Sequence, residues 1–252
     1  MILLFDIGNT HTHLGVGDDR RIIASADIPT RAWFDGTAPE RVWQCLPQKA
    51  YAGAALCSVV PAATSLARQF ATDACHAEAL ELTPATLRGV GIVYPRPETI
   101  GPDRLANVAA ARHHYGAPSV VVDFGTAVTF DVLDSNANYV GGIIAPGLAA
   151  MTDYLHEKTA LLPRIKIREI DAVIGKSTEE AMLIGAVHGY RGLIRELIQE
   201  LRRELNAPHL PVIATGGYAE LISAKLPEIT AVAPNLTLEG LRLAYQAIGY
   251  RL

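Results

Sequence analysis

Two glycine turns, each preceded by an aspartate, could hold a phosphate chain. The first is Asp6-Ile7-Gly8-Asn9-Thr10 and the second is Asp123-Phe124-Gly125-Thr126-Ala127. A glycine turn directly after a strand leaves backbone N–H groups free to converge on an anion, and Asn or Thr side chains add donors. The aspartate ahead of each turn suits Mg²⁺, which binds protein through one or two carboxylates and otherwise keeps water and phosphate oxygens. One such turn alone would more often be plain hairpin chemistry, but two in corresponding places favour a phosphate site.

A third cluster, Gly101-Pro102-Asp103-Arg104, directly precedes a predicted helix. In isolation Asp103 is best explained as a first-turn carboxylate that interacts favourably with the helix dipole. A carboxylate there could also orient a bound hydroxyl and accept its proton while a phosphoryl group leaves ATP. The adjacent Arg104 could clamp a substrate carboxylate with paired hydrogen bonds. The three clusters together indicate a small-molecule kinase that uses ATP.

Two further features have weaker functional interpretations. His11 and His13 share one face of a predicted strand, but a metal pair is not favoured because no third His or Cys lies nearby in the sequence. Gly216-Gly217 would allow close approach of a nucleotide base or ribose, and a helix-start turn without a ligand is nearly as plausible. Neither glycine turn matches a Walker loop or a dinucleotide fingerprint.

The elements that position these residues form an internal repeat. The two aspartates are 117 residues apart, nearly half of the 252-residue chain. In each copy a strand enters the turn, a second strand leaves it, and a polar reversal leads to a third. The predicted strands are residues 2–5, 12–16 and 21–26 in the first copy and 120–122, 128–133 and 139–144 in the second, with a less similar pair at 55–60 and 212–214.

Helices alternate with the later strands. The clear ones are residues 104–115, 177–205, 218–225 and 238–250. This order predicts two similar α/β domains, 1–116 and 117–252, with a boundary near Gly116 and a cleft between them.

The long helix carries an apolar stripe and three glycines. The stripe is Val187, Tyr190, Ile194, Leu197 and Leu201, and the glycines are 185, 189 and 192. Core packing is the slightly favoured explanation of the stripe, and a dimer seam is the alternative.

Composition bounds the function class. Half of the residues are apolar, 19% are charged, and the net charge is −4 without a run of Lys or Arg, so the chain offers no broad basic surface for nucleic acid. The three cysteines are odd in number and lack CxxC spacing, which favours reduced thiols. No signal-like N-terminus and no membrane-length apolar run are present. We expect a cytoplasmic protein that binds neither nucleic acid nor membrane.

Taken in order, the motifs resemble those of the type III pantothenate kinases, a family that includes Bvg accessory factor homologues. The resemblance spans nearly the whole chain and is far more specific than any one motif. The motifs that match the family are residues 6–10, Tyr94, 97–107 (Pro-Glu-Thr-Ile-Gly-Pro-Asp-Arg-Leu-Ala-Asn), 122–127, 142–147 (Gly-Ile-Ile-Ala-Pro-Gly), 162–163, 174–178, 214–217 and 236–241.

The resemblance implies duplicated ribonuclease H-like domains of the acetate and sugar kinase, heat-shock protein and actin superfamily. It implies ATP-dependent phosphorylation of pantothenate, the first step of coenzyme A biosynthesis, by a homodimer whose pantothenate site draws on both subunits. That last point shifts the expectation for the long helix towards a dimer seam.

The same resemblance implies roles for individual residues. Asp103 would be the catalytic proton acceptor, and Asp123 would hold a monovalent cation such as K⁺ or NH₄⁺. Asp6 stays the candidate for Mg²⁺, bound directly or through water, on the chemistry of its carboxylate. The residues that would line ATP are Asp6, Ile7, Gly8, Asn9, Thr10, His11, Thr12, His13 and Thr126. Those that would bind pantothenate are Tyr94, Gly101, Pro102, Asp103, Arg104 and Thr178.

Two departures from the family pattern remove no proposed catalytic group. Pro102 stands where Ala is usual, and Ser177 stands where Asn is usual. Two other functions stay open at this point: a regulator that binds nucleotide without turnover, and a kinase or phosphatase of the same superfamily with another substrate. Product formation from ATP and pantothenate would separate the three.

Overall fold

The structure is a computed structural model that describes residues 1–249 of the chain. Contacts group these residues into two compact units. The first unit contains Met1–Ala117, Ser135–Val140 and the residues from Asn235 onward, and the second contains Pro118–Asp134 and Gly141–Pro234. The domain boundary between residues 116 and 117 stays a prediction.

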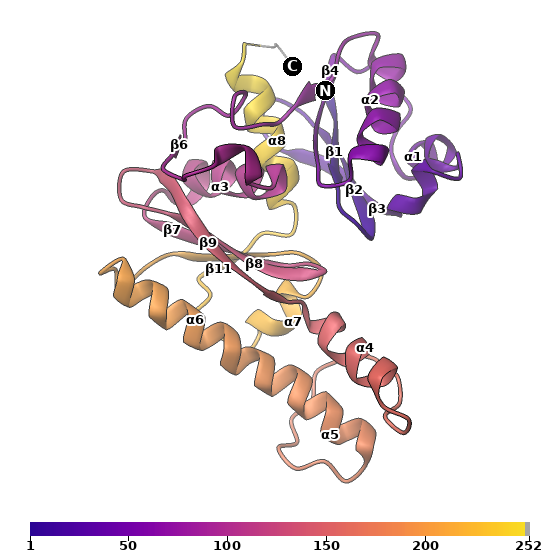
Figure 1. Ribbon diagram of the computed structural model, residues 1–252. Helices are drawn as coiled ribbons and strands as arrows, with labels where there is room; N and C mark the ends of the chain where they lie inside the picture. The colour runs from indigo at the N-terminus through magenta and orange to yellow at the C-terminus, as the bar shows by residue number, and fades with distance from the viewer. Residues whose placement is uncertain (250–252) are drawn as a thin grey trace. The chain divides into compact units, whose positions relative to one another are not determined.

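The first unit is built on a five-stranded sheet with the order β3-β2-β1-β4-β5. Strand β1 pairs antiparallel with β2 and parallel with β4, and β2 pairs antiparallel with β3 (Figure 1). The strands are β1 (Ile2–Ile7), β2 (His11–Gly17), β3 (Ile22–Pro29), β4 (Gly53–Ser58) and β5 (Leu80–Glu81).

Helices cover both faces of this sheet. They are α1 (Ala38–Cys45), α2 (Pro61–Cys75), α3 (Pro102–Tyr115) and α8 (Leu236–Ala247), with 3₁₀ turns η1 (Thr30–Trp33) and η2 (Pro97–Thr99). Alternation along β1 places Leu3, Phe5 and Ile7 in the core with α1 and α2. The other face meets α8, where a Cβ on Gly15 would lie only 2.8 Å from Cδ1 of Leu238. Glycine on this face therefore allows α8 to lie close against the sheet.

The second sheet has the order β11-β10-β7-β8-β9-β6. Its strands are β6 (Gly91–Ile92), β7 (Ser119–Phe124), β8 (Ala127–Leu133), β9 (Asn138–Pro146), β10 (Val212–Thr215) and β11 (Ala231–Val232). Taken as third, second, first, fourth and fifth strands, β9, β8, β7, β10 and β11 repeat the order of the first sheet. The duplicated strand pattern predicted from the two aspartate turns is thus confirmed, and β6 is an addition to it.

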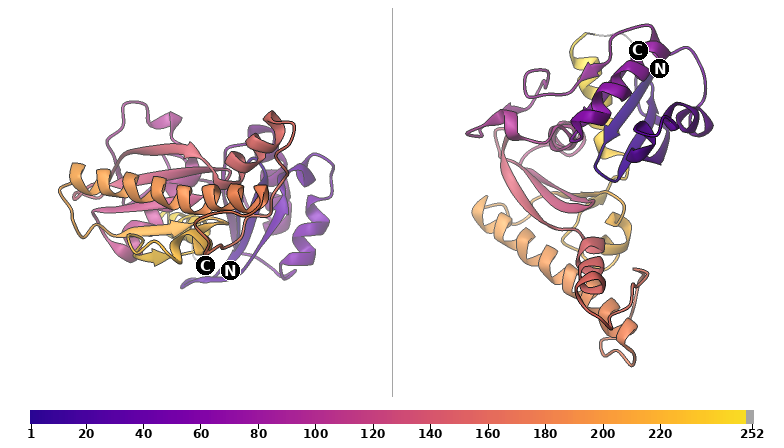
Figure 2. Two further views of the ribbon diagram at one scale, coloured as in Figure 1. Left: turned by 90° about the horizontal axis from the view of Figure 1, so that it is seen from below. Right: turned by 45° about the vertical axis from the view of Figure 1, so that its right-hand side comes forward.

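The remaining helices belong to the second unit. They are α4 (Leu148–Lys158), α5 (Thr178–Ile184), α6 (Tyr190–Glu204) and α7 (Ala219–Ser223), with a π-helical turn η3 (Gly185–Gly189) between α5 and α6. Figure 2 shows α5, η3 and α6 as one continuous rod. The predicted helix at 177–205 is therefore present. The apolar periodicity of the sequence did not reveal the π turn from Gly185 to Gly189 within it.

Other predicted helices are also present with shifted ends. Helix α3 begins two residues earlier than predicted, α7 is shorter than 218–225, and α8 begins at Leu236. Tyr250, the predicted end of the last helix, lies outside the described residues. Within residues 1–249, no helix is both long enough and apolar enough to cross a bilayer.

The stripe on the long helix packs into the core of the second unit. Val187, Tyr190 and Ile194 are buried, and the Tyr190 ring lies 6.3 Å from that of Phe124 on β7. Leu197 and Leu201 are only half-buried. Core packing thus explains the first three stripe residues without a second subunit.

Candidate active site

The first aspartate turn joins β1 to β2. The Gly8 N–H donates to the carbonyl of His11 over 3.0 Å, which closes the hairpin. Asn9, Thr10 and His11 are exposed, whereas Asp6 and Gly8 are half-buried. The turn therefore presents its polar tip to solvent while its aspartate stands at the end of a buried strand.

Alternation along β2 separates the predicted ATP-lining residues into two groups. Leu14 and Val16 pack in the core with α1 and α2, so Thr12 faces the core as well, while His11 and His13 face the opposite side. Thr12 is fully buried, and the indole N–H of Trp33 donates to its hydroxyl over 3.1 Å. Ile7 is also fully buried. Of the eight residues from 6 to 13, these two offer only main-chain atoms to a ligand at the turn.

Asp6 lies beside two polar side chains on the neighbouring strands. It is in register with His13 on β2 and with Cys57 on β4. The thiol of Cys57, itself buried, donates to Oδ1 of Asp6 over 3.3 Å. The Cys57 thiol thereby orients the Asp6 carboxylate at the half-buried end of β1. An ionised carboxylate only accepts hydrogen bonds, so it suits a cation.

His13 lies between two oxygen acceptors. Its Nδ1 donates to Oδ1 of Asp27 over 2.7 Å, and its Nε2 lies 3.2 Å from Oδ1 of Asn235, the N-cap residue of α8. Burial alone would lower the pKa of His13, but the hydrogen bond and charge of Asp27, with Asn235 and Asp6, raise it above its usual value. The hydrogen bond to His13 in turn lowers the pKa of Asp27. The two oxygen acceptors thus oppose the effect of burial and favour the protonated form of the ring.

Asp103 and Arg104 open helix α3. Pro102 occupies the first helical position, where its missing N–H costs nothing, and the Arg104 N–H donates to Oδ1 of Asp103 over 2.9 Å. Burial raises the pKa of Asp103, and its interactions with Arg104 only partly offset this. A Cβ on Gly101 would collide with the Asp103 carboxylate. The local sequence therefore holds a half-buried carboxylate whose proton affinity is raised.

A buried tyrosine joins Arg104 to Tyr94. The guanidinium carbon of Arg104 lies 5.7 Å from the ring centroid of Tyr139, and the Tyr94 ring meets the same ring edge-on at 6.0 Å. Tyr139 is fully buried, while Tyr94 is 37% exposed. Cation–π and edge-to-face contacts of this kind fix side-chain orientation. Tyr139 was not predicted as a site residue, because nothing in its sequence spacing connects it to residues 94 and 104.

Helix α8 supports α3 from behind. The Thr237 hydroxyl donates to Oδ1 of Asn107 over 2.8 Å, and both residues are buried. At Gly240 the helices approach so closely that a Cβ would collide with the backbone of Ala106. The first turn of α3, with Asp103, is therefore held by helix packing rather than by a loop.

In the second unit, glycines surround the aspartate turn between β7 and β8. Asp123 is half-buried, and Gly125 and Thr126 are exposed. Gly216 has φ +88°, and a Cβ there would lie 2.5 Å from Oδ1 of Asp123. A Cβ on Gly147 would collide with the carbonyl of Thr126. Two glycines from distant parts of this unit thus pack closely against the Asp123 carboxylate and its turn, where any larger residue would collide.

Thr178 is the first residue of α5 and is exposed. Ser177 is the N-cap of this helix, since its hydroxyl accepts from the Glu180 N–H over 3.2 Å. Asn and Ser are about equally good N-caps, so Ser is an adequate substitute for the Asn usual at this position. Pro102 is explained in the same way by its place at the start of α3.

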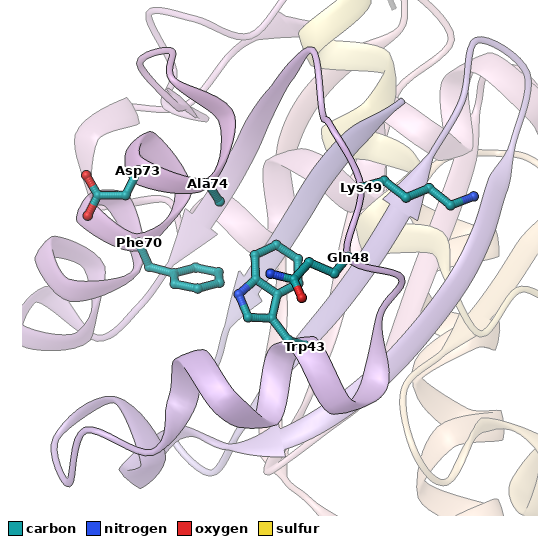
Figure 3. A pocket seen from close by; sticks show the side chains of 6 residues that line it. All are labelled: Trp43, Gln48, Lys49, Phe70, Asp73 and Ala74. Atoms are coloured by element: carbon teal, nitrogen blue, oxygen red, sulfur yellow. The ribbon is translucent and has the colours of Figure 1, made fainter.

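The predicted residues fall into separate groups. In the first unit, residues 6–13 form the turn, while Tyr94, Asp103 and Arg104 gather around Tyr139. In the second unit, Asp123 and Thr126 lie with two glycines. A pocket of about 310 Å³ in the first unit contains none of these residues, and the side chains of Lys49 and Asp73 point away from its central Trp43 (Figure 3).

Comparison with known proteins identifies the family of the chain. A profile of the family described as type III pantothenate kinase matches residues 2–200. A type III pantothenate kinase of Akkermansia muciniphila is 45% identical over 243 residues, covering 96% of this chain and 97% of the relative. Another, of Methylacidiphilum infernorum, is 42% identical and covers 96% of this chain and 87% of the relative.

Solved structures share the fold at low identity. A Baf family protein of Campylobacter jejuni superposes with a TM-score of 0.62 at 19% identity, covering 98% of each chain. Component A of (R)-2-hydroxyglutaryl-CoA dehydratase from Acidaminococcus fermentans superposes with a TM-score of 0.51 at 14% identity, covering 96% of this chain and 95% of the other. The predicted α/β fold of duplicated ribonuclease H-like domains is confirmed.

Proposed function

Because the chain belongs to the type III pantothenate kinase family, it phosphorylates pantothenate with ATP, and we propose that Asp103 accepts the proton of the pantothenate hydroxyl. The product is 4'-phosphopantothenate, and the reaction is the first step of coenzyme A biosynthesis. The observation that carries the assignment of Asp103 is its raised pKa on the rigid first turn of α3, beside a guanidinium. A general base works best when its pKa is shifted towards the operating pH.

Pantothenate binds at the start of α3. Its carboxylate pairs with Arg104, whose guanidinium is oriented by the ring of Tyr139. Tyr94, held edge-on against the same ring, adds a partly exposed aromatic surface. Gly101 and Pro102 supply the backbone next to Asp103. Thr178, exposed at the start of α5, is a further residue that we assign to pantothenate.

ATP binds through the polar tip of the first turn and through Thr126. Residues 6–13 supply backbone N–H groups and side-chain donors, with Ile7 and Thr12 limited to main-chain contacts by their burial. His13, in register with Asp6 on the neighbouring strand, adds a ring N–H donor beside the turn. Thr126 contributes from the exposed second turn.

Phosphoryl transfer follows from this placement. The pantothenate hydroxyl oxygen forms a bond to the γ-phosphorus while the bond from that phosphorus to the bridging oxygen of ADP breaks. The hydroxyl proton passes to Asp103. Little covalent chemistry is asked of the protein, so alignment of the hydroxyl and stabilisation of charge supply most of the rate.

Two cations fit the carboxylates of the turns. Asp6, an oriented and half-buried carboxylate at a phosphate turn, would hold Mg²⁺ directly or through water. Asp123, a half-buried carboxylate at the second turn, would hold K⁺ or NH₄⁺. When bound, these ions neutralise negative charge on the phosphates.

The second unit carries the features of a homodimer interface. Leu161, Val173 and Ile174 are 91%, 76% and 70% exposed, which is unusual for large apolar side chains. They lie on an extended segment that the bidentate Glu169–Arg191 ion pair fastens to α6. A Cβ on Gly185, Gly189 or Gly192 would meet no atom within 4 Å, so that face of the long helix is open to a partner. A second copy of the chain would cover both features.

We assign the reaction to the cytoplasm. Cys45, Cys57 and Cys75 are all free thiols. Unpaired cysteines are ordinary where thiols are kept reduced.

Replacing Asp103 by Asn tests the catalytic assignment. The amide keeps the shape but cannot accept the proton, so turnover should fall by at least about a hundredfold. In the wild-type protein, kcat/KM should fall as the pH falls through the pKa of Asp103, which lies above the usual 3.8. Steady-state assays with ATP and pantothenate from pH 4 to 8 measure both.

A matched control is Glu98→Gln, which removes an exposed carboxylate from the preceding 3₁₀ turn. It should leave turnover unchanged. Asp103→Asn with wild-type turnover at saturating Mg-ATP would remove Asp103 from catalysis and leave it as a first-turn helix carboxylate.

A further inference from the structure

We propose that Thr30 is the positioning residue of the ATP turn, and that Thr12 and Trp33 act through it. Thr30 is the first residue of the 3₁₀ turn η1 that follows β3, far in sequence from residues 8–10. It is 1% exposed, so it cannot itself touch a ligand in solvent. The proposal rests on the assignment of ATP to the first turn.

Thr30 holds both ends of that turn. Its hydroxyl donates to the carbonyl of Gly8 over 2.6 Å. Its backbone N–H donates to the carbonyl of Thr10 over 3.0 Å. One residue therefore fixes the first and the last carbonyl of the Gly8-Asn9-Thr10 segment.

Fixing these carbonyls also fixes the N–H groups that follow them. In a trans peptide the C=O and the next N–H point in opposite directions. With the carbonyls of Gly8 and Thr10 held towards Thr30, the N–H groups of Asn9 and His11 point away from it. These are the donors that a phosphate at the exposed turn would use.

The hydroxyl of Thr30 is itself oriented by a one-way chain of hydrogen bonds. Because the Thr30 proton is given to Gly8, the Thr12 hydroxyl, 3.1 Å from that of Thr30, must donate to it. The Thr12 oxygen in turn accepts the indole N–H of Trp33. Each hydrogen bond in the series from Trp33 through Thr12 and Thr30 to Gly8 therefore has one possible donor. In a buried series of this kind the hydrogen bonds strengthen one another.

The 3₁₀ geometry explains why Thr30 and Trp33 reach the same place. Residues three apart eclipse one another in a 3₁₀ turn, so both side chains face Thr12. Thr12 is on the core face of β2, which is the face that meets η1. Its hydroxyl thus serves the turn from inside and not as an ATP ligand.

The test compares Thr30→Val, Thr12→Val and Trp33→Phe by steady-state kinetics. Loss of one buried hydrogen bond costs about 0.5–1.5 kcal/mol, so Thr30→Val should raise the KM for ATP by roughly two- to twelvefold and leave the KM for pantothenate unchanged. Thr30→Ser should restore the wild-type value. The effect should decrease in the order Thr30→Val, Thr12→Val, Trp33→Phe, since each step is further from Gly8.

The matched control is Thr64→Val, which removes another buried hydroxyl that donates to a carbonyl, that of Val60, outside residues 6–13. An equal rise in KM for Thr64→Val would show general destabilisation and overturn the proposal. So would a larger effect for Thr12→Val than for Thr30→Val, which would make Thr12 a direct ligand. If Thr30→Val does not fold, the ranking of Thr30→Ser, Thr12→Val and Trp33→Phe still decides.

Failure of the underlying function is distinguishable. A wild-type protein that makes no 4'-phosphopantothenate contradicts the kinase assignment. Variants that differ only in turnover at saturating ATP, while wild-type kinase activity is intact, contradict only the role of Thr30.

Discussion

The pKa of His13 is set by the polar side chains that surround its ring. It lies against the Asp27 carboxylate on β3 and the Asn235 side chain before α8, and it is in register with Asp6. Its pKa is raised above 6.5 and that of Asp27 is lowered below 3.8. A buried imidazole alone would shift the other way, so the partners decide the sign.

Asp27→Asn tests this pair. A raised His pKa adds stability that is fully present below pH 6.5 and is lost as pH rises through the folded pKa. A lowered Asp pKa adds stability that is present above pH 3.8 and is lost as pH falls through its folded pKa. In Asp27→Asn the pKa of His13 should therefore fall, as measured by NMR titration of the ring protons.

The Asp27→Asn variant should lose most stability between pH 3.8 and pH 6.5 and little at high pH. Urea unfolding at a series of pH values measures this loss. Asp19→Asn, at an exposed carboxylate 68% accessible, is the control and should not move the His13 titration. Identical His13 titration in Asp27→Asn and the wild type would contradict the pairing.

At the level of single residues, the sequence pattern could propose only part of the candidate site. The aspartates, the turn glycines and Asp103-Arg104 are contiguous motifs, so they could be found by type and spacing. Thr30 and Tyr139 could not, because they reach the site through the fold and not along the chain. Thr12 is instructive, since period-two alternation with Leu14 and Val16 already places it on the core face.

Among the elements, α3 and α8 decide how rigidly the acceptor site is held. Their contact depends on Gly240, where a Cβ would collide with the Ala106 backbone, and on the buried Asn107–Thr237 hydrogen bond. Asp103 and Arg104 lie one turn or less from this contact on α3. Displacement of α8 should therefore also move Asp103 and Arg104, the residues proposed to bind pantothenate.

Gly240→Ala measures that coupling. Helix propensity alone would make Ala more stable than Gly by ~1 kcal/mol, but collision with the helix backbone should reverse the sign and cost about 1–3 kcal/mol. The KM for pantothenate should rise, because the first turn of α3 shifts. Thermal unfolding and steady-state kinetics measure the two effects.

Gly217→Ala is the control for that substitution, because a Cβ there meets nothing within 4 Å. It should leave stability nearly unchanged. A Gly240→Ala protein more stable than wild type would show that α3 and α8 can separate without cost.

Element prediction succeeded where the repeat gave two copies of one pattern. The hairpin that contains each aspartate turn was predictable, because two apolar strands are separated there by turn-forming residues. The two-residue strands β5, β6 and β11 carry no periodicity, and their pairing comes from tertiary contacts. The π turn at Gly185–Gly189 also lacks a pattern of its own.

For the whole molecule, we expect a second copy of the chain to complete the proposed pantothenate site. The exposed apolar segment with Ile174 and the open glycine face of the long helix both belong to the second unit. Thr178, proposed to bind pantothenate, follows that segment directly. An interface formed there would place the partner next to a substrate-binding residue.

Ile174→Asp tests the interface. A charge on a side chain that is 70% exposed should cost the isolated chain little, but an unpaired charge buried between subunits should weaken the dimer by at least about tenfold. Sedimentation at several protein concentrations measures the dissociation constant, and turnover of pantothenate should fall with the fraction of dimer. Phe34→Asp, at an apolar side chain in the first unit that is 55% exposed, is the control and should stay dimeric and active. A monomeric wild-type protein with full turnover, or an Ile174→Asp protein that stays dimeric, would contradict an interface on this face.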